Sequence, residues 1–281
     1  MLKLLSTSAS GREKSAIMPS LIALAMGSCA YYYYYSIQNK RQVEDEHCIY
    51  LDYNGTTPIY PDVLNSMLPY LTQHYGNPSS SHHYGKEPRK AINAARKQIL
   101  GLLGAGEDPI ESIWFTGCGT ESDNLAIQLA LQSAAPKRSK HIVTCNVEHP
   151  AVELYLKHLE SEGLITVTYV PVDKEGRVSA EDVIAVMTSN TILVTLMLAN
   201  NESGALQPIK EVAMECRKRG ILMHTDAAQA AGKVSCELED LGYPDLISVV
   251  GHKLGAVSNC LWYVYFDHLL VRSNILYFSF Q

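Results

Sequence analysis

The sequence has no excess of positive charge. Its 281 residues include 23 lysines and arginines against 29 aspartates and glutamates, so its formal net charge is −6. Proteins that bind nucleic acid neutralise phosphates with clustered basic side chains, and no basic stripe is present here. The charge balance therefore argues against a nucleic-acid partner and is compatible with an enzyme that acts on small molecules.

The chain also lacks a CxxC pair. Its seven cysteines are scattered and odd in number: Cys29, Cys48, Cys118, Cys145, Cys216, Cys236 and Cys260. Disulfide frameworks and structural zinc sites use paired cysteines at regular spacings. We therefore expect reduced thiols, no metal site and a cytosolic protein.

Long uncharged runs are scarce, and the one of interest covers residues 17–37. A stretch of about 20 apolar residues can span a bilayer, but Pro19, Gly27 and five consecutive tyrosines weaken that interpretation. A membrane anchor, a targeting peptide and a poorly ordered extension all remain open. We assign residues 1–46 to an N-terminal extension, with membrane contact expected only through 17–37.

From residue 47 onward, short apolar runs alternate with helical patterns. Residues 191–198 form a near-continuous apolar run, which is typical of a parallel strand buried on both faces. This alternation predicts an α/β fold with a mostly parallel sheet flanked by helices. The predicted strands are 113–116, 141–145, 165–171, 191–198, 221–223, 246–250 and 261–266.

Polar residues follow two of these predicted strands. His224, Thr225 and Asp226 come after 221–223, and Gly251, His252 and Lys253 come after 246–250. The carboxyl ends of parallel strands are where ligands bind in such folds. A carboxylate and a lysine at one sheet edge suit pyridoxal phosphate, which needs a lysine for a Schiff base and a carboxylate at its ring nitrogen.

A glycine-rich turn precedes a predicted helix in GCGTESDNLAI. Thr120 is a good N-cap candidate, with Asp123 as the acid three residues later. Because free N–H groups and the helix dipole both favour anions, this turn is a candidate phosphate site. An ordinary capped helix is the alternative.

Two further polar residues stand at the ends of predicted elements. His149 precedes a helix that starts near Pro150, where a histidine often serves as a cap or a surface group. Asn201 follows the strand at 191–198, where asparagine is common in turns. Local sequence alone leaves both alternatives open.

Seven segments together resemble one known family. They are LDYNGTTP, YGNPSSSHHYG, GTESDNLAI, VEHPAV, LANNESG, HTDAAQAAGK and VGHK, in that order along the chain. They look like class V aminotransferase-type enzymes, the group that contains NifS-like cysteine desulfurases and selenocysteine lyases. The resemblance covers about residues 49–256. It implies a pyridoxal-phosphate-binding large domain of fold type I, which we place at 47–256.

The resemblance also implies roles for individual residues. Lys253 matches the lysine that binds the cofactor covalently, Asp226 the partner of the ring nitrogen, and His149 the histidine that stacks on the ring and moves protons. The remaining implied cofactor contacts are Gly119, Thr120 and His252 at the phosphate, and Asn201 and Gln229 at the ring oxygen.

The implied reaction removes selenium or sulfur from Cβ of an amino acid and leaves alanine. The segments LMLANNESG, HTDAAQAAGK and VVGHK are closer to selenocysteine lyases, because desulfurases usually carry serine where this chain has Val250. Selenocysteine lyase is therefore the main prediction, and cysteine desulfurase is the alternative. Family members are homodimers, so a homodimer is expected for a full-length form.

After Lys253 the sequence departs from the family pattern. We treat 257–281 as a divergent tail and expect the small C-terminal domain to be missing. The arginine that binds the substrate carboxylate and the cysteine that accepts the chalcogen would be missing with it. A third hypothesis follows, in which the chain is a truncated form that binds the cofactor without turnover.

Overall fold

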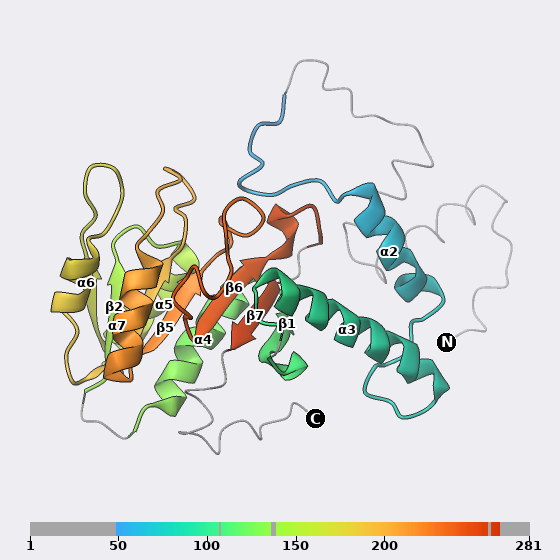
Figure 1. The fold of residues 1–281 in the computed structure, drawn as a ribbon, viewed down its shortest axis with the longest axis horizontal. Helices are drawn as coiled ribbons and strands as arrows, with labels where there is room; N and C mark the ends of the chain where they lie inside the picture. Colours follow the sequence, from blue (N-terminus) through green and yellow to red (C-terminus); the bar gives the residue numbers. More distant parts are fainter. Residues whose placement is uncertain (1–48, 107, 136–138, 258–259, 265–281) are drawn as a thin grey trace, which may run out of the picture. The chain divides into compact units, whose positions relative to one another are not determined.

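A computed structural model of the protein describes residues 49–106, 108–135, 139–257 and 260–264. The elements below belong to one compact unit that begins at Asp52. Within the described residues, seven strands form one sheet in the order β1-β7-β6-β5-β4-β2-β3 (Figure 1). The strands are β1 (Ile113–Thr116), β2 (His141–Cys145), β3 (Thr166–Val170), β4 (Thr191–Met197), β5 (Leu222–Asp226), β6 (Leu246–Val250) and β7 (Cys260–Val264).

The sheet is mostly parallel, as the alternating pattern predicts. Strands β2 to β6 pair in parallel, and β7 runs antiparallel between β6 and β1. The helices are α2 (Pro61–Thr72), α3 (His83–Leu102), α4 (Gly119–Ser133), α5 (Pro150–Ser161), α6 (Ala180–Ala185) and α7 (Ile209–Arg219), with short 3₁₀ turns η1 (Ile110–Ser112) and η2 (Gly251–Lys253).

Helices cover both faces of the sheet, which explains why its strands are apolar throughout. On β2, Val143 packs into a core that includes Val212 of α7. Ile142 points the other way, into a core that includes Ile127 of α4 and Leu156 of α5. Since successive side chains of a strand alternate between faces, a sheet buried on both sides needs apolar residues at almost every position.

Two local predictions are corrected by the structure. Strand β5 runs through to Asp226, so its polar residues belong to the strand and do not follow it. Helix α4 starts at Gly119 with Cys118 as N-cap residue, which excludes Thr120 as the cap. Glu121, not Asp123, reaches back: its Oε2 accepts the N–H of Gly117 at 2.6 Å. In β5, pairing of the polar residues with the neighbouring strand β4 extends the strand beyond its apolar run.

The predicted strand at 261–266 is present as β7, which starts one residue earlier, at Cys260, and is described as far as Val264. The remainder of the divergent tail and the apolar run 17–37 lie outside the described residues. Within the part of the chain that the structure describes, no helix is long and apolar enough to cross a membrane.

Candidate active site

A cavity of about 460 Å³ lies where β4, β5 and β6 end and α4 begins. The structure brings all eight predicted site residues to its lining: Gly119, Thr120, His149, Asn201, Asp226, Gln229, His252 and Lys253. They come from five separate stretches of sequence. Its position at the carboxyl ends of parallel strands is the one expected for a ligand site in this type of sheet.

Asp226 is the last residue of β5 and is 6% exposed. Its Oδ1 accepts the N–H of Ala228 at 2.8 Å. Burial raises the pKa of this carboxyl group, while the Ala228 N–H, His149 and Lys253 oppose that rise. A cationic ring nitrogen in the cavity would therefore favour the charged form of Asp226.

Lys253 is the last residue of the η2 turn that follows β6. Hydrogen bonds from Thr57 hold this turn in place. The Thr57 N–H and Oγ1 both donate to the His252 carbonyl oxygen at 2.8 Å, and Thr57 Oγ1 accepts the N–H of Gly255 at 2.8 Å. Within the described residues, Lys253 Nζ makes no hydrogen bond or ion pair. The backbone of Lys253 is thus fixed while its amine stays available to a ligand. LDYNGTTP is among the family-like segments of the sequence, but no role for Thr57 is predicted from it.

Asn54 and Lys233 orient the amide of Gln229. Gln229 Nε2 donates to the Asn54 carbonyl oxygen at 2.9 Å. Lys233 Nζ bridges Gln229 Oε1 at 2.9 Å and Asn54 Oδ1 at 3.1 Å. One N–H of the Gln229 amide remains for a ligand, because an amide nitrogen carries two.

The first turn of α4 supplies a site for an anion. The N–H groups of Gly119 and Thr120 have no partner within the helix, as in the first turn of any helix, and the helix dipole adds partial positive charge. His252 also lines the cavity, and its Nδ1 lies 3.1 Å from Thr56 Oγ1. Burial, followed by the charge of Lys253, lowers the pKa of His252. Neutral His252 can still donate one hydrogen bond to a phosphate.

His149 caps a helix and also lines the cavity. Its Nδ1 accepts the N–H of Ala151 at 3.1 Å and so caps α5. With Nδ1 as acceptor, the neutral ring carries its proton on Nε2. The cap therefore fixes the orientation of an imidazole that lines the cavity.

Asn200, which sequence reasoning missed, shapes the turn that carries Asn201. Its Oδ1 accepts the N–H groups of Glu202 at 3.0 Å and Ser203 at 2.8 Å. Its Nδ2 donates to the Val147 carbonyl oxygen at 3.1 Å. The turns that hold Asn201 and His149 are thereby joined.

A row of buried polar side chains crosses the sheet beneath α4. His224 Nδ1 lies 2.8 Å from Thr195 Oγ1, and His224 Nε2 lies 3.0 Å from Ser248 Oγ. Asp123 of α4 is also buried and lines the cavity. These residues are far apart along the chain, so only the fold reveals that they meet.

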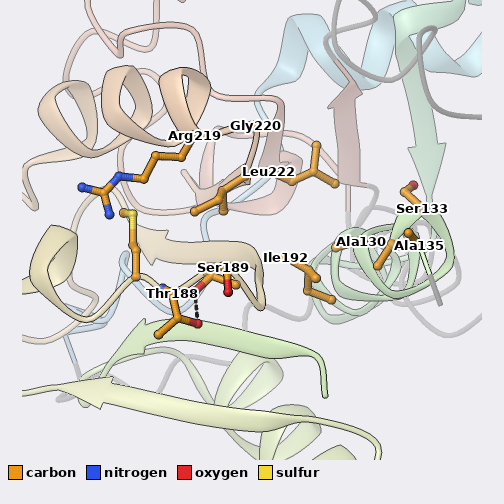
Figure 2. A pocket seen from close by; sticks show the side chains of 13 residues that line it. Ala130, Ser133, Ala135, Thr188, Ser189, Ile192, Arg219, Gly220 and Leu222 are labelled. Carbon is orange, nitrogen blue, oxygen red and sulfur yellow. Dashed lines mark hydrogen bonds between the residues drawn. The ribbon is translucent and has the colours of Figure 1, made fainter. Parts of the chain in front are cut away.

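A second cavity, of about 800 Å³, lies at the opposite edge of the sheet. Figure 2 shows its lining, which comes from the ends of α4 and α7 and the starts of β4 and β5. Among the described residues of this lining, Arg219 is the only charged one, and its Nε pairs with Glu215 at 2.8 Å. The described part of this second cavity therefore offers no acid and no amine for catalysis.

The family model for class V aminotransferases ("Aminotransferase class-V") matches residues 49–258. This chain belongs to the class V aminotransferase family. The match begins just before the loop at Asp52 and ends after the turn that carries Lys253. It therefore includes every residue of the cavity described above.

Among curated relatives, a cysteine desulfurase from Nostoc sp. is 46% identical over 208 residues, covering 74% of this chain and 50% of that protein. The cysteine desulfurase IscS of Clostridium botulinum is 43% identical over 205 residues, with 73% and 50% covered. The chain thus spans about half the length of these relatives.

Solved structures agree with this family. "SspA in complex with cysteine" superposes with a TM-score of 0.72 at 35% identity, covering 77% of this chain and 61% of that chain. A "NifS-like protein" gives a TM-score of 0.72 at 35% identity, with 78% and 59% covered. The predicted fold-type-I architecture of NifS-like enzymes is confirmed. The relatives are named as desulfurases, and none of those cited here supports the selenocysteine lyase prediction specifically.

Enzymes of this family depend on pyridoxal phosphate, and the cavity fits that group. Lys253 offers an amine without a partner in the described chain, and Asp226 offers a carboxylate oxygen beyond the one bound to Ala228. The N-terminus of α4 faces the same cavity. A volume near 460 Å³ falls within the range of about 300–1,000 Å³ typical of small-molecule sites.

Proposed function

We propose that this chain binds pyridoxal phosphate and supplies the cofactor-binding part of an enzyme that removes sulfur from L-cysteine, leaving alanine. One observation carries the proposal: Asp226 and Lys253 reach one cavity from the ends of adjacent parallel strands, with a helix N-terminus beside them. The 46% identity to a cysteine desulfurase supports the same conclusion.

Different residues would bind different parts of the cofactor. Lys253 would hold its aldehyde carbon, Asp226 its ring nitrogen, and the first turn of α4 with His252 its phosphate. When bound, the cofactor supplies an electron-withdrawing ring that stabilises negative charge at the substrate Cα. Asp226 sustains this property because its carboxylate keeps a proton on the ring nitrogen.

The protein's own groups would move the protons. The Lys253 amine is tethered at the cavity and can take a proton from the substrate Cα, provided that it is neutral at that stage. His149 presents its Nε2–H from a fixed ring and can donate a hydrogen bond or a proton. The Asn54–Gln229–Lys233 contacts hold the amide of Gln229 in place beside them.

L-Selenocysteine is the second candidate substrate, and one residue favours it. Val250 lines the cavity at the end of β6 and is 4% exposed. It provides no hydroxyl group at the position where desulfurases usually carry serine. A direct comparison of alanine release from L-cysteine and L-selenocysteine distinguishes the two substrates.

Cofactor binding is the first experiment. The chain is mixed with pyridoxal phosphate, and the visible absorbance of the Schiff base is followed after gel filtration. We expect retained absorbance for the wild-type chain and its loss in Lys253→Ala. Lys157→Ala is the matched control, since Lys157 is an exposed residue of α5 that pairs with Glu153 and does not line the cavity. Equal absorbance in wild type and Lys253→Ala contradicts the proposal.

Turnover is assayed separately on the same preparation. Alanine and sulfide released from L-cysteine are measured with and without added cofactor. Alanine release supports the proposed desulfurase activity of this chain. Cofactor binding without release supports the non-catalytic alternative.

A further inference from the structure

Asp123 is a buried acid in the cavity that the proposed mechanism does not use. It lies in the second turn of α4 and lines the cavity together with Asp226. Its side chain is 4% exposed, and its Oδ1 has no hydrogen-bond partner among the described residues. A buried carboxylate with one oxygen unpaired is unfavourable in its charged form, and such a group usually keeps its proton instead.

His224 does not compensate a charge on Asp123. Its Nε2 lies 3.7 Å from Asp123 Oδ1, which is too far for a hydrogen bond. Both ring nitrogens of His224 already face the hydroxyl groups of Thr195 and Ser248. Burial lowers the pKa of His224 to about 3, so its ring is neutral.

Asp226 is better placed to carry charge. It accepts the Ala228 N–H at 2.8 Å, and His149 and Lys253 favour its ionised form. Two neighbouring carboxyl groups in a water-poor site do not readily ionise together. The proton of the pair therefore belongs on Asp123.

We propose that Asp123 is a neutral acid that leaves Asp226 as the one charged carboxylate of the pair, and so positions that charge for a cationic ring nitrogen. The link to the ring rests on the proposed function. The protonation itself concerns this chain alone. Asp123 is thus a positioning residue that acts through Asp226.

The groups around Asp123 support this assignment. Burial, followed by the charges of Asp226 on β5 and Glu148 before α5, raises the pKa of Asp123 well above its usual value. Ser248 on β6 and Lys253 on η2 act in the opposite direction. The geometry and the electrostatics therefore agree.

The first test uses the chain without cofactor. Infrared spectra in D₂O at neutral pH resolve the C=O stretch of protonated carboxylic acids. We expect Asp123→Asn to remove one such band from the wild-type spectrum. Glu148→Gln is the matched control and should remove a different band. Acid bands left unchanged by Asp123→Asn overturn the proposal.

The second test follows the visible absorbance of bound pyridoxal phosphate against pH. The wild-type chain should show an alkaline transition as Asp123 ionises. Asp123→Asn should lack it, and Ser248→Ala should shift it to higher pH, because Ser248 favours the ionised acid. An unchanged transition in Asp123→Asn overturns the proposal. If the wild-type chain binds no cofactor, the proposed function fails, and the infrared result still decides the protonation of Asp123.

Discussion

At the scale of single residues, the most unusual group outside the Asp123–Asp226 pair is Glu148. Its Oε1 accepts the Met197 N–H at 2.8 Å and the Cys145 thiol at 3.0 Å, while Oε2 has no partner among the described residues. Burial is the main cause that raises the pKa of Glu148, to about 8 from a usual 4.5. In the folded protein, Glu148 is therefore still protonated at neutral pH.

This shift predicts how stability depends on pH. The folded state holds the Glu148 proton up to about pH 8, whereas the unfolded chain releases it near 4.5. The free energy of unfolding of the wild-type protein therefore decreases as the pH rises between these two pKa values. The free energy of unfolding of Glu148→Gln should rise relative to that of wild type by on the order of a few kcal/mol as the pH rises through this window. Urea unfolding at a series of pH values measures this difference.

A matched control separates this effect from the loss of a glutamate as such. Glu153 is a surface residue of α5 that pairs with Lys157 at 2.5 Å. Glu153→Gln should change stability by less than about 0.5 kcal/mol at any pH. A Glu148→Gln curve parallel to that of wild type from pH 4.5 to pH 8 would show that Glu148 is ionised in the folded protein.

The sequence predicts some site residues well and others not at all. Asp226 and Lys253 stand at the ends of apolar runs and within long family motifs, so their type and place both point to the cofactor. Asp123, His224 and Ser248 come from three different elements, and no spacing pattern links Asp123 to the other two. Their proximity depends on how α4 crosses β5 and β6, which local patterns do not encode.

At the scale of elements, the end of α7 shows how local sequence fixes a boundary. Gly220 follows Arg219 with φ of 66°, in the left-handed region, and its N–H bonds to the Arg217 carbonyl oxygen. This conformation costs little only for glycine. Glycine at position 220 therefore explains why α7 ends at Arg219.

Substitution of Gly220 tests this explanation. Gly220→Ala should lower the free energy of unfolding by about 1 kcal/mol, because alanine is strained at positive φ. Gly101 on α3 is the control: an added Cβ there meets no atom within 4 Å. Gly101→Ala should stabilise by about 0.5–1 kcal/mol. Equal effects of both variants in urea unfolding would contradict the role of the left-handed residue.

Element bounds are harder to predict where polar residues enter a strand. The apolar run 221–223 suggests a short strand, yet β5 continues through His224 and Thr225 to Asp226. Those residues pair in register with Thr195, Leu196 and Met197 of β4. Pairing with a neighbouring strand, which the sequence does not reveal, carries β5 past the end of its apolar run.

At the scale of the whole molecule, the proposed cofactor would join parts that are distant in sequence. The cavity is lined by the loop at Asp52, the start of α4, and the ends of β5 and β6. Pyridoxal phosphate at 100 times its dissociation constant should therefore stabilise the fold by about 2.7 kcal/mol. Thermal unfolding with and without cofactor measures this gain.

Two comparisons sharpen the thermal measurement. Lys253→Ala should lose most of the stabilisation, since the covalent attachment is gone. Pyridoxal without its phosphate should stabilise the wild-type chain less, because the N-terminus of α4 then has no anion to bind. Equal stabilisation by both compounds would place the phosphate away from α4.

The position of β7 has a consequence for biosynthesis. Strand β1 has β7 as its partner in the sheet, with Ile113 opposite Tyr263, so strands β2 to β6 are all translated between the two. While the ribosome is still making the intervening segments, β1 at the edge of the sheet has no β7 with which to pair. The parallel strands can assemble first, and the nascent sheet gains β1 only when a late hairpin-like partner arrives.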